Sequence, residues 1–210
     1  ASKEWVEELS KVAASSSMTL AAHLCGKRVN EVLDGDDIFL STLYALGFRR
    51  VQINATAVNG VDTSNLEGAV PTLLGLVGKH NNLEFIIQKN EETKPLWQGI
   101  LDLPTGVPDN VTMLMDESKG TGVLASSWPQ PPENYNIGYA GGIGPSNIKC
   151  VLQDVMVAGN GKEIWIDMES SLRTIDQNGK DTFDLNKCFQ CIDAVCEAGI
   201  CDYSHPSFLS

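Results

Sequence analysis

The sequence predicts an α/β fold in which helices cover a parallel sheet, and three observations lead to this prediction. Short apolar segments of strand length alternate six times with segments of helical periodicity. The apolar segments are continuous, which is typical of strands buried on both faces. The 210 residues, of which 42% are hydrophobic, show no linker and suffice for one domain over residues 1–210.

Apolar periodicity sets the expected limits of each element. Trp5, Leu9 and Val12 share one face of a first helix. The expected strands are 18–26, 49–55, 83–88, 110–118, 136–140 and 163–169. The expected helices are 4–13, 28–47 with a break near Gly35, 70–80, 93–100, a helix from Pro145 and 183–199. Three segments of polar residues, glycine or proline are expected as loops, namely 56–66, 119–135 and 170–182.

The formal net charge of -12 limits the classes of partner. Binding to nucleic acid or to an anionic membrane surface needs a basic surface, so neither is expected. No apolar run is long enough to span a bilayer, and the first ten residues do not resemble a secretory signal. We therefore expect a cytoplasmic protein whose partner is a small molecule.

Six cysteines raise the question of a metal or redox site. Cys188 and Cys191 have the spacing of a CxxC motif. The six cysteines of the chain are Cys25, Cys150, Cys188, Cys191, Cys196 and Cys201. The segment 183–199 nevertheless has the apolar face of a helix, formed by Phe183, Leu185, Cys188, Phe189, Ile192, Val195 and Cys196. We therefore expect reduced, packed thiols and neither a metal nor a cofactor.

The segment YAGGIGPSNI, residues 139–148, joins an expected strand to an expected helix. Gly141 and Gly142 allow positive φ and a close approach to the backbone. Pro145 suits the first position of the helix, whose buried face would be Ile148, Val151, Leu152 and Val155. Such a loop either binds an anion through its free N–H groups or only connects the two elements.

Polar or glycine residues follow most of the expected strands. They are His23, Cys25, Gln52, Asn54, Gln88, Asp116, Gly141, Gly142, Asp167, Glu169 and Ser170. In a (βα)8 barrel these residues would meet at one rim, where the chemistry of that fold takes place. An open doubly wound sheet is the other architecture, but the segment HLCGKR after an early strand is not a nucleotide fingerprint.

Four segments in this order resemble phosphoribosylanthranilate isomerase. They are LMDESKGTG, YAGGIGPSNI, IDMESSLRT and NGKDTFDLNK, and VQIN at residues 51–54 adds weaker support. The resemblance covers about residues 110–190. It implies a TIM-type (βα)8 barrel of which six βα units are visible, and an aldose–ketose rearrangement of a phosphorylated sugar, as in tryptophan biosynthesis.

The resemblance also assigns roles to residues. Asp116 matches the catalytic acid, Gly141 and Gly142 match the phosphate-binding glycines, and Ser170, followed by Ser171, matches the serine loop. His23, Gln52, Asn54 and Arg173 are expected in the substrate pocket. Two residues depart from the pattern: Glu169 would repel a phosphate, and Arg173 would offset it by pairing with Glu169 or with the ligand.

The catalytic base depends on how the strands are counted. If 18–26 is the first strand, Cys25 matches the base, but the chain then has six strands. If it is the third, which we favour, the first two strands precede Ala1. A chain that begins at Ala1 would expose strand edges, so we expect it to pair with a second copy or to be poorly soluble.

Two alternatives stay open. One is a TIM-barrel relative that binds a ligand or a protein without catalysis. The other is a lyase or aldolase, which would need a metal or a Schiff-base lysine, and no lysine ends an expected strand.

Overall fold

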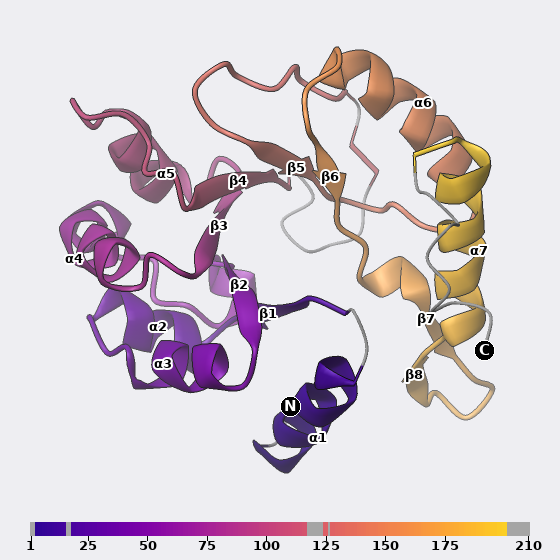
Figure 1. The fold of residues 1–210 in the computed structure, drawn as a ribbon, viewed down its shortest axis with the longest axis horizontal. Helices are drawn as coiled ribbons and strands as arrows, with labels where there is room; N and C mark the ends of the chain where they lie inside the picture. The colour runs from indigo at the N-terminus through magenta and orange to yellow at the C-terminus, as the bar shows by residue number, and fades with distance from the viewer. Residues whose placement is uncertain (1–2, 16–17, 117–123, 126, 201–210) are drawn as a thin grey trace. The chain divides into compact units, whose positions relative to one another are not determined.

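The computed structural model describes residues 3–15, 18–116, 124–125 and 127–200, and Figure 1 shows their fold. Six strands, β1 to β6, form one sheet whose strand order is the order of the chain. The pairs β1–β2, β2–β3 and β5–β6 are parallel. As far as the structure describes the chain, an α-helix lies between each of these strands and the next except between β4 and β5, and the predicted α/β class with six strands is confirmed.

The chain divides into two compact units. Unit 1 comprises residues 1–114 and 134–136, and unit 2 comprises residues 115–133 and 137–210. The prediction of a single barrel domain stays a prediction. None of the helices described is long and apolar enough to cross a lipid bilayer.

Unit 1 contains most of the sheet and its central core. Its elements are α1 (Lys3–Ala14), β1 (Leu20–Leu24), α2 (Lys27–Leu33), α3 (Ile38–Ala45), β2 (Phe48–Ile53), η1 (Ala57–Asn59), α4 (Leu66–Lys79), β3 (Glu84–Lys89), α5 (Lys94–Leu101) and β4 (Val111–Met115), whose last residue belongs to unit 2. Val51, Ile53, Phe85 and Ile87 are fully buried. They lie on one side of β2 and β3 because successive side chains of a strand alternate between its faces.

The expected break in 28–47 is confirmed, because α2 and α3 are separated around Gly35 with φ of 92°. The expected helix 70–80 begins earlier than predicted. Asn65 caps α4 by accepting a hydrogen bond from the N–H of Gly68 at 3.2 Å, and Pro71 lies inside the helix.

Unit 2 contains the end of the sheet and a separate hairpin. Its elements are β5 (Ile137–Tyr139), α6 (Ile148–Gly159), β6 (Trp165–Ile166), η2 (Ser170–Leu172), β7 (Arg173–Ile175), β8 (Asp181–Phe183) and α7 (Leu185–Glu197). The predicted buried face of α6, with Ile148, Val151, Leu152 and Val155, is confirmed. The predicted start at Pro145 is wrong, because Gly144 to Asn147 form a turn that ends where α6 begins.

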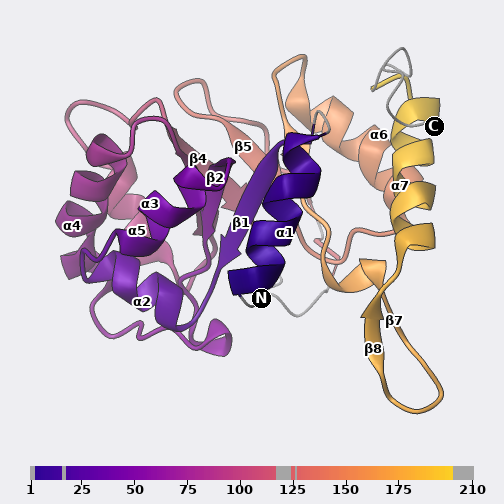
Figure 2. The same ribbon diagram turned by 60° about the horizontal axis from the view of Figure 1, so that its bottom comes forward.

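Two further expectations in unit 2 are wrong. The expected loop 170–182 contains η2, β7 and most of β8, and β7 and β8 form an antiparallel hairpin that Figure 2 shows projecting from the end at which α7 begins. The expected apolar face of 183–199 does not form a core: Phe183, Leu185, Phe189 and Ile192 are exposed, whereas Cys191 and Ala194 are buried. Asp184 caps α7 and thereby places Phe183 in β8 instead of in the helix.

The cysteines differ in burial and in whether they form a disulfide bond. Cys25 and Cys150 are free and exposed, and Cys188 and Cys191 are free and more buried. Cys196 is disulfide-bonded, so the expectation of reduced thiols throughout is wrong at this position. Cys201 lies outside the described residues. The cytoplasmic location stays a prediction.

Candidate functional site

In unit 2, main-chain hydrogen bonds place the ends of three strands side by side. The N–H of Ala140 donates to the carbonyl of Met115 at 2.9 Å, and the N–H of Asp167 donates to the carbonyl of Tyr139 at 2.9 Å. Asp116, Gly141 and Asp167 therefore follow adjacent strands at their carboxyl ends. In parallel α/β proteins this is the edge at which ligands bind.

The loop after β5 has the conformation that the two glycines predict. Gly141 has φ of 110° and Gly142 has φ of 63°, which is the region that residues with a side chain avoid. Among the described residues, none accepts a hydrogen bond from the N–H of Gly141 or Gly142. These two donors are half-buried and remain available for an acceptor.

Asn147 holds this loop in place. Its side-chain oxygen accepts a hydrogen bond from the N–H of Gly144 at 2.9 Å, and its side-chain nitrogen donates to the carbonyl of Gly142 at 2.8 Å. We did not assign Asn147 a role from the sequence. Its position immediately before the apolar face of a helix is a signal that could have identified it, since asparagine favours caps and turns.

The loop before β7 packs directly on the glycine loop. A Cβ atom added to Gly144 would lie 2.4 Å from the Cβ atom of Ser171. Only a residue without a side chain permits this approach. The structure therefore brings Ser171 to the glycine loop, and Ser170 precedes it as an exposed residue.

The carboxylates of this region differ in exposure. Asp116 is buried, with 6% of its surface exposed, and follows β4 directly. Glu169 is exposed and precedes η2. The Gly-rich residues that follow Asp116 in the sequence, 117–123, lie outside the described residues.

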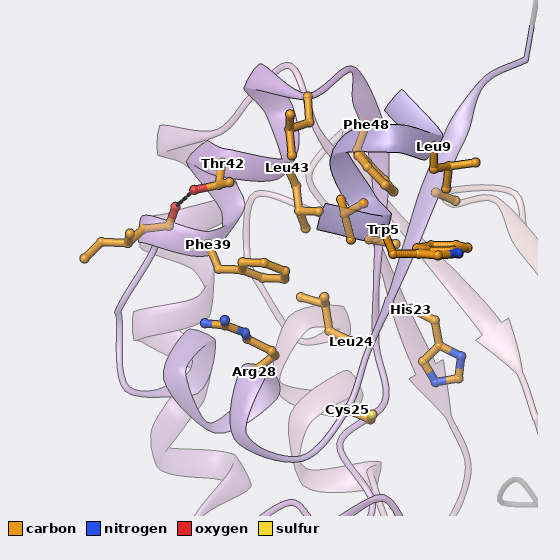
Figure 3. Close-up of a pocket in the computed structure, with 15 residues that line it drawn as sticks. Trp5, Leu9, His23, Leu24, Cys25, Arg28, Phe39, Thr42, Leu43 and Phe48 are labelled. Carbon is orange, nitrogen blue, oxygen red and sulfur yellow. Dashed lines mark hydrogen bonds between the residues drawn. The ribbon is translucent and has the colours of Figure 1, made fainter. Parts of the chain in front are cut away.

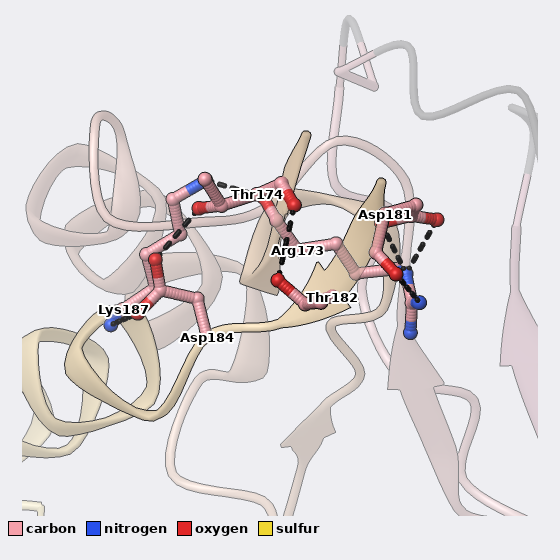
Figure 4. A network of polar contacts seen from close by, with 6 residues as sticks. All are labelled: Arg173, Thr174, Asp181, Thr182, Asp184 and Lys187. Carbon is pink, nitrogen blue, oxygen red and sulfur yellow. Dashed lines mark hydrogen bonds and ion pairs between the residues drawn. The ribbon is translucent and has the colours of Figure 1, made fainter. Parts of the chain in front are cut away.

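Arg173 pairs within the hairpin, as Figure 4 shows. Its Nε–H donates to both carboxylate oxygens of Asp181 at 2.9 Å, and Lys187 donates to the Arg173 carbonyl. The sequence predicted Glu169 or a ligand as its partner and did not identify Asp181. The position of this ion pair on an exposed hairpin gives no support to a role of Arg173 in a substrate pocket.

The remaining predicted site residues belong to unit 1. His23 pairs in register with Gln52 on the parallel strands β1 and β2, so the two side chains share one face. Gln52 and Asn54 are buried, and the Gln52 amide donates to Asn54 Oδ1 at 3.0 Å. His23 and Cys25 are exposed. The structure thus brings Gln52 and Asn54 together at the carboxyl end of β2.

Lys89 ends β3, which corrects the expectation that no lysine ends a strand. Its ammonium group donates to the hydroxyl of Tyr135 at 3.0 Å and lies 4.4 Å from the centre of the Trp97 ring. Ile86 is the register partner of Gln52, so Lys89 projects from the opposite face of β3. A Schiff-base role beside Gln52 therefore has no support.

Both thiols of the CxxC motif lie in α7, where Cys188 is half-buried and Cys191 is buried. Burial raises the pKa of Cys188 and of Cys191, which favours the unreactive thiol form. Cys188 Sγ also lies 3.3 Å from the carbonyl of Asp184, as in an ordinary helix. No group of three or more His, Cys, Asp or Glu side chains with metal-binding geometry occurs in the described part of the chain.

Comparisons with known proteins identify the fold and no family. No protein-family model matches the chain, and no curated protein matches it significantly. The catalytic domain of a family GH18 chitinase from the fern Peteris ryukyuensis is similar, with a TM-score of 0.50, 12% identity, and coverage of 88% of this chain and 76% of that chain. N-(5'-phosphoribosyl)anthranilate isomerase from Pyrococcus furiosus gives a TM-score of 0.46, 13% identity, and coverage of 91% and 80%.

The chitinase domain is a TIM barrel, so the chain has a fold of the TIM-barrel class. At this identity the similarity concerns the fold alone.

Proposed function

We propose that this chain is an isomerase-like enzyme that acts on a phosphorylated sugar and holds the phosphate in the two loops that follow β5 and β6. The observation that carries the proposal is the pair of N–H groups at Gly141 and Gly142, for which the described part of the chain offers no acceptor, in a loop that contacts Ser171. Phosphate groups are bound in this way by backbone donors of glycine loops ahead of a helix. The sequence resemblance to phosphoribosylanthranilate isomerase supports the same ligand.

The proposed reaction is an Amadori-type rearrangement of an aldose to a ketose. The substrate carries an amino group at C1; an acid protonates the ring oxygen, the bond between C1 and this oxygen breaks, and the nitrogen lone pair forms a protonated imine. A base then removes the proton from C2 to give an enolamine, which takes up a proton at C1 as the C2 hydroxyl loses its own, and the product is a 1-amino-ketose. In this proposal Asp116 is the acid, by its match to the family pattern; it is buried and directly follows β4.

Cys25 is the proposed base under the strand count in which 18–26 comes first, since only then does it match the family pattern. It is a free thiol at the end of β1. Gln52 and Asn54 are proposed substrate contacts through the resemblance of VQIN, and His23 through its position at the end of a strand. Arg173 has the least support because it binds Asp181.

A thermal-shift titration tests the phosphate site. Inorganic phosphate and a ribulose-phosphate analogue are compared with chloride at equal ionic strength. A ligand that binds only the folded chain stabilises it by about 2.7 kcal/mol at a hundred times its Kd. A saturable shift that is lost in Gly142→Asp supports the site, and no shift for either ligand contradicts it.

The variant Asp116→Asn tests the chemistry separately from binding. Asn has nearly the shape of Asp but cannot donate the carboxyl proton. We expect loss of turnover with an unchanged phosphate-induced shift. Unchanged turnover would contradict the role of Asp116. It would leave the evidence for the phosphate site intact, because that evidence comes from the titration of Gly142→Asp.

A second candidate is a TIM-barrel relative that binds a ligand or a protein without catalysis. The observation that favours it is Glu169, an exposed carboxylate next to Ser170, while Arg173 pairs with Asp181. A dianionic phosphate next to a carboxylate is repelled. If phosphate shifts the melting temperature of Glu169→Gln but not of the natural chain, this second candidate is the better description.

A further inference from the structure

We propose that a cavity in unit 1 binds a small apolar molecule that carries a single negative charge, such as an aromatic carboxylate. The cavity has a volume of about 590 Å³ and is lined by residues of α1, β1, α2, α3 and the start of β2 (Figure 3). Ligand pockets of proteins have volumes of roughly 300–1,000 Å³ and are mostly apolar with a few polar groups. The cavity shares His23 and Cys25 with the residues proposed above to contact the substrate, whereas the proposed phosphate-binding glycines belong to unit 2.

The cavity runs along the free edge of β1. Ala22 and Leu24 line it from one face of the strand, and Ala21 and His23 line it from the other. A space that touches both faces of a strand lies at its edge, and β1 is the end strand of the sheet with β2 on its other side. Helix α1 borders this space through Trp5 and Leu9.

The walls are apolar, and part of the apolar lining is exposed. Leu43 and Phe48 are buried beneath the cavity, with 2% and 4% of their surface exposed. Trp5 and Ile38 also line it, yet 58% and 74% of their surface is exposed. An apolar ligand would remove part of this surface from water, which favours binding.

The charges around the cavity select an anion. The chain has 27 acidic residues, but none of the residues that line this cavity in the described structure is acidic. Arg28 lines it, with its guanidinium 4.0 Å from the centre of the Phe39 ring. The cavity therefore differs from the chain as a whole, whose net charge of -12 repels anions.

Arg28 keeps donors for a ligand although it has one acidic neighbour. Its Nη1 donates to Glu31 at 2.7 Å, and Lys27 Nζ lies 3.5 Å from the other oxygen of the same carboxylate. Two cations share one anion, so this group has a net positive charge. The Nε–H and Nη2–H groups of Arg28 bond to no other residue of the described chain, and a carboxylate fits two such donors.

The first test compares two probes with the same ring and opposite charge. The full chain is titrated calorimetrically with 2-naphthoate and with 2-naphthylmethylammonium. We expect saturable binding of one naphthoate and at least tenfold weaker binding of the amine. In Arg28→Gln the affinity for naphthoate should fall about tenfold, because one charge-assisted pair is lost, while that for the amine should not fall.

Ile38 offers a matched pair of variants at an exposed position. Ile38→Asp and Ile38→Asn have nearly the same shape and differ in charge, and an acidic residue is tolerated at the first turn of α3. We expect naphthoate to bind Ile38→Asp at least several-fold more weakly than Ile38→Asn. Phe189→Ser, in the exposed apolar face of α7, should leave naphthoate binding unchanged.

Thiol labelling locates the bound probe. Cys25 lines the proposed cavity, and Cys150 is an equally free and exposed thiol that lines a separate cavity against α6. Naphthoate should slow the alkylation of Cys25, measured by mass spectrometry, and leave that of Cys150 unchanged.

Three results would overturn the proposal. The first is equal affinity for the two probes, or naphthoate binding that is the same in Arg28→Gln and Ile38→Asp as in the natural chain. The second is protection of Cys150 instead of Cys25. The third is a dimer in sedimentation whose Cys25 is already protected without probe, since a second copy would then occupy the cavity.

Discussion

At the scale of single residues, Gly144 connects the two loops of the proposed phosphate site. Its backbone is bonded to Asn147 on one side and faces the Cβ atom of Ser171 on the other. The two loops can therefore pack together only because residue 144 has no side chain, while the side chain of Asn147 holds the glycine loop in place.

Gly144→Ala should destabilise unit 2 by about 1–3 kcal/mol, the usual cost of overpacking. The new Cβ would lie 2.4 Å from Ser171 Cβ, so one loop must move away from the other. Urea denaturation measures the loss. The double variant Gly144→Ala with Ser171→Gly removes the clashing atoms and should regain most of the stability; an equal loss in both variants would contradict this explanation.

Asp37 gives a prediction for pH. Lys79 Nζ and His80 Nε2 both lie 2.6 Å from Asp37 Oδ2, and the hydrogen bond from Lys79, followed by that from His80, holds the pKa of Asp37 below its ordinary value. Because the pKa of Asp37 is lower in the folded chain than in the unfolded chain, where it is about 3.9, the ionised carboxylate stabilises the fold at pH values above about 3.9. This stabilisation is lost as the pH falls through the pKa that Asp37 has in the folded chain.

Asp37→Asn removes this contribution. The variant should be less stable than the natural chain near neutral pH, and the difference should shrink as the pH falls below about 4. Thermal unfolding of both proteins over this range measures it. A difference that stays constant at low pH would mean that the charge of Asp37 is not the cause.

At the scale of elements, Asp184 determines where α7 begins. Its Oδ1 accepts from the N–H groups of Asn186 and Lys187 at 3.0 and 3.4 Å, and its Oδ2 accepts from the Thr174 hydroxyl at 2.6 Å. One side chain thus caps the helix and ties it to β7 of the hairpin, as Figure 4 shows.

Asp184→Ala should loosen the first turn of α7 and the hairpin together. Hydrogen exchange of the Asn186 and Lys187 amides should become faster, and Asp184→Asn, which keeps the capping oxygen, should have a smaller effect. The Thr174 hydrogen bond keeps the pKa of Asp184 low, so the effect should also diminish in acid. Faster exchange in α7 with an unchanged hairpin would contradict the link between them.

The elements that the sequence predicted correctly are those whose cause is local. Continuous apolar segments identify the strands of unit 1, and Gly35 identifies the break between α2 and α3. The hairpin β7–β8 was not predicted because its residues are exposed and polar, and its partners are cross-strand pairs such as Arg173 and Asp181. The face of α7 was mispredicted because periodicity shows that a helix has an apolar face but not that a neighbour covers it.

In the candidate site, too, the features with a local cause could be predicted from the sequence, and those that depend on packing could not. The positive φ of Gly141 and Gly142 could be predicted, because two adjacent glycines after a strand indicate such a loop. The contact of Gly144 with Ser171 could not, because it joins two segments through the packing of unit 2. Lys89 was placed outside its strand because a strand boundary from sequence is uncertain by a few residues.

At the scale of the whole molecule, the net charge of -12 opposes compaction. The described ion pairs include exposed ones, such as Lys149 with Glu197 at 2.7 Å, and exposed pairs contribute little to stability. Added salt weakens both the repulsion between like charges and the attraction within these pairs. The stability gained from the weaker repulsion should therefore exceed the stability lost from the weaker pairs.

We expect the melting temperature to rise between about 20 and 300 mM NaCl, since the Debye length shortens over this range. Potassium chloride should give the same rise, because screening depends on ionic strength and not on the cation. A fall in melting temperature would mean that the ion pairs dominate.

The hairpin β7–β8 also has a practical consequence. Its two strands form a sheet of their own, and residues 175–183 are exposed. Its tip is a self-contained turn, in which Asp176 Oδ1 accepts from the N–H groups of Asn178 and Lys180. Exposed tips of this kind tolerate inserted sequence. A fluorescent reporter or an affinity epitope placed between Asn178 and Gly179 would leave the six-stranded sheet intact, so the protein could be labelled for imaging without altering either proposed binding site.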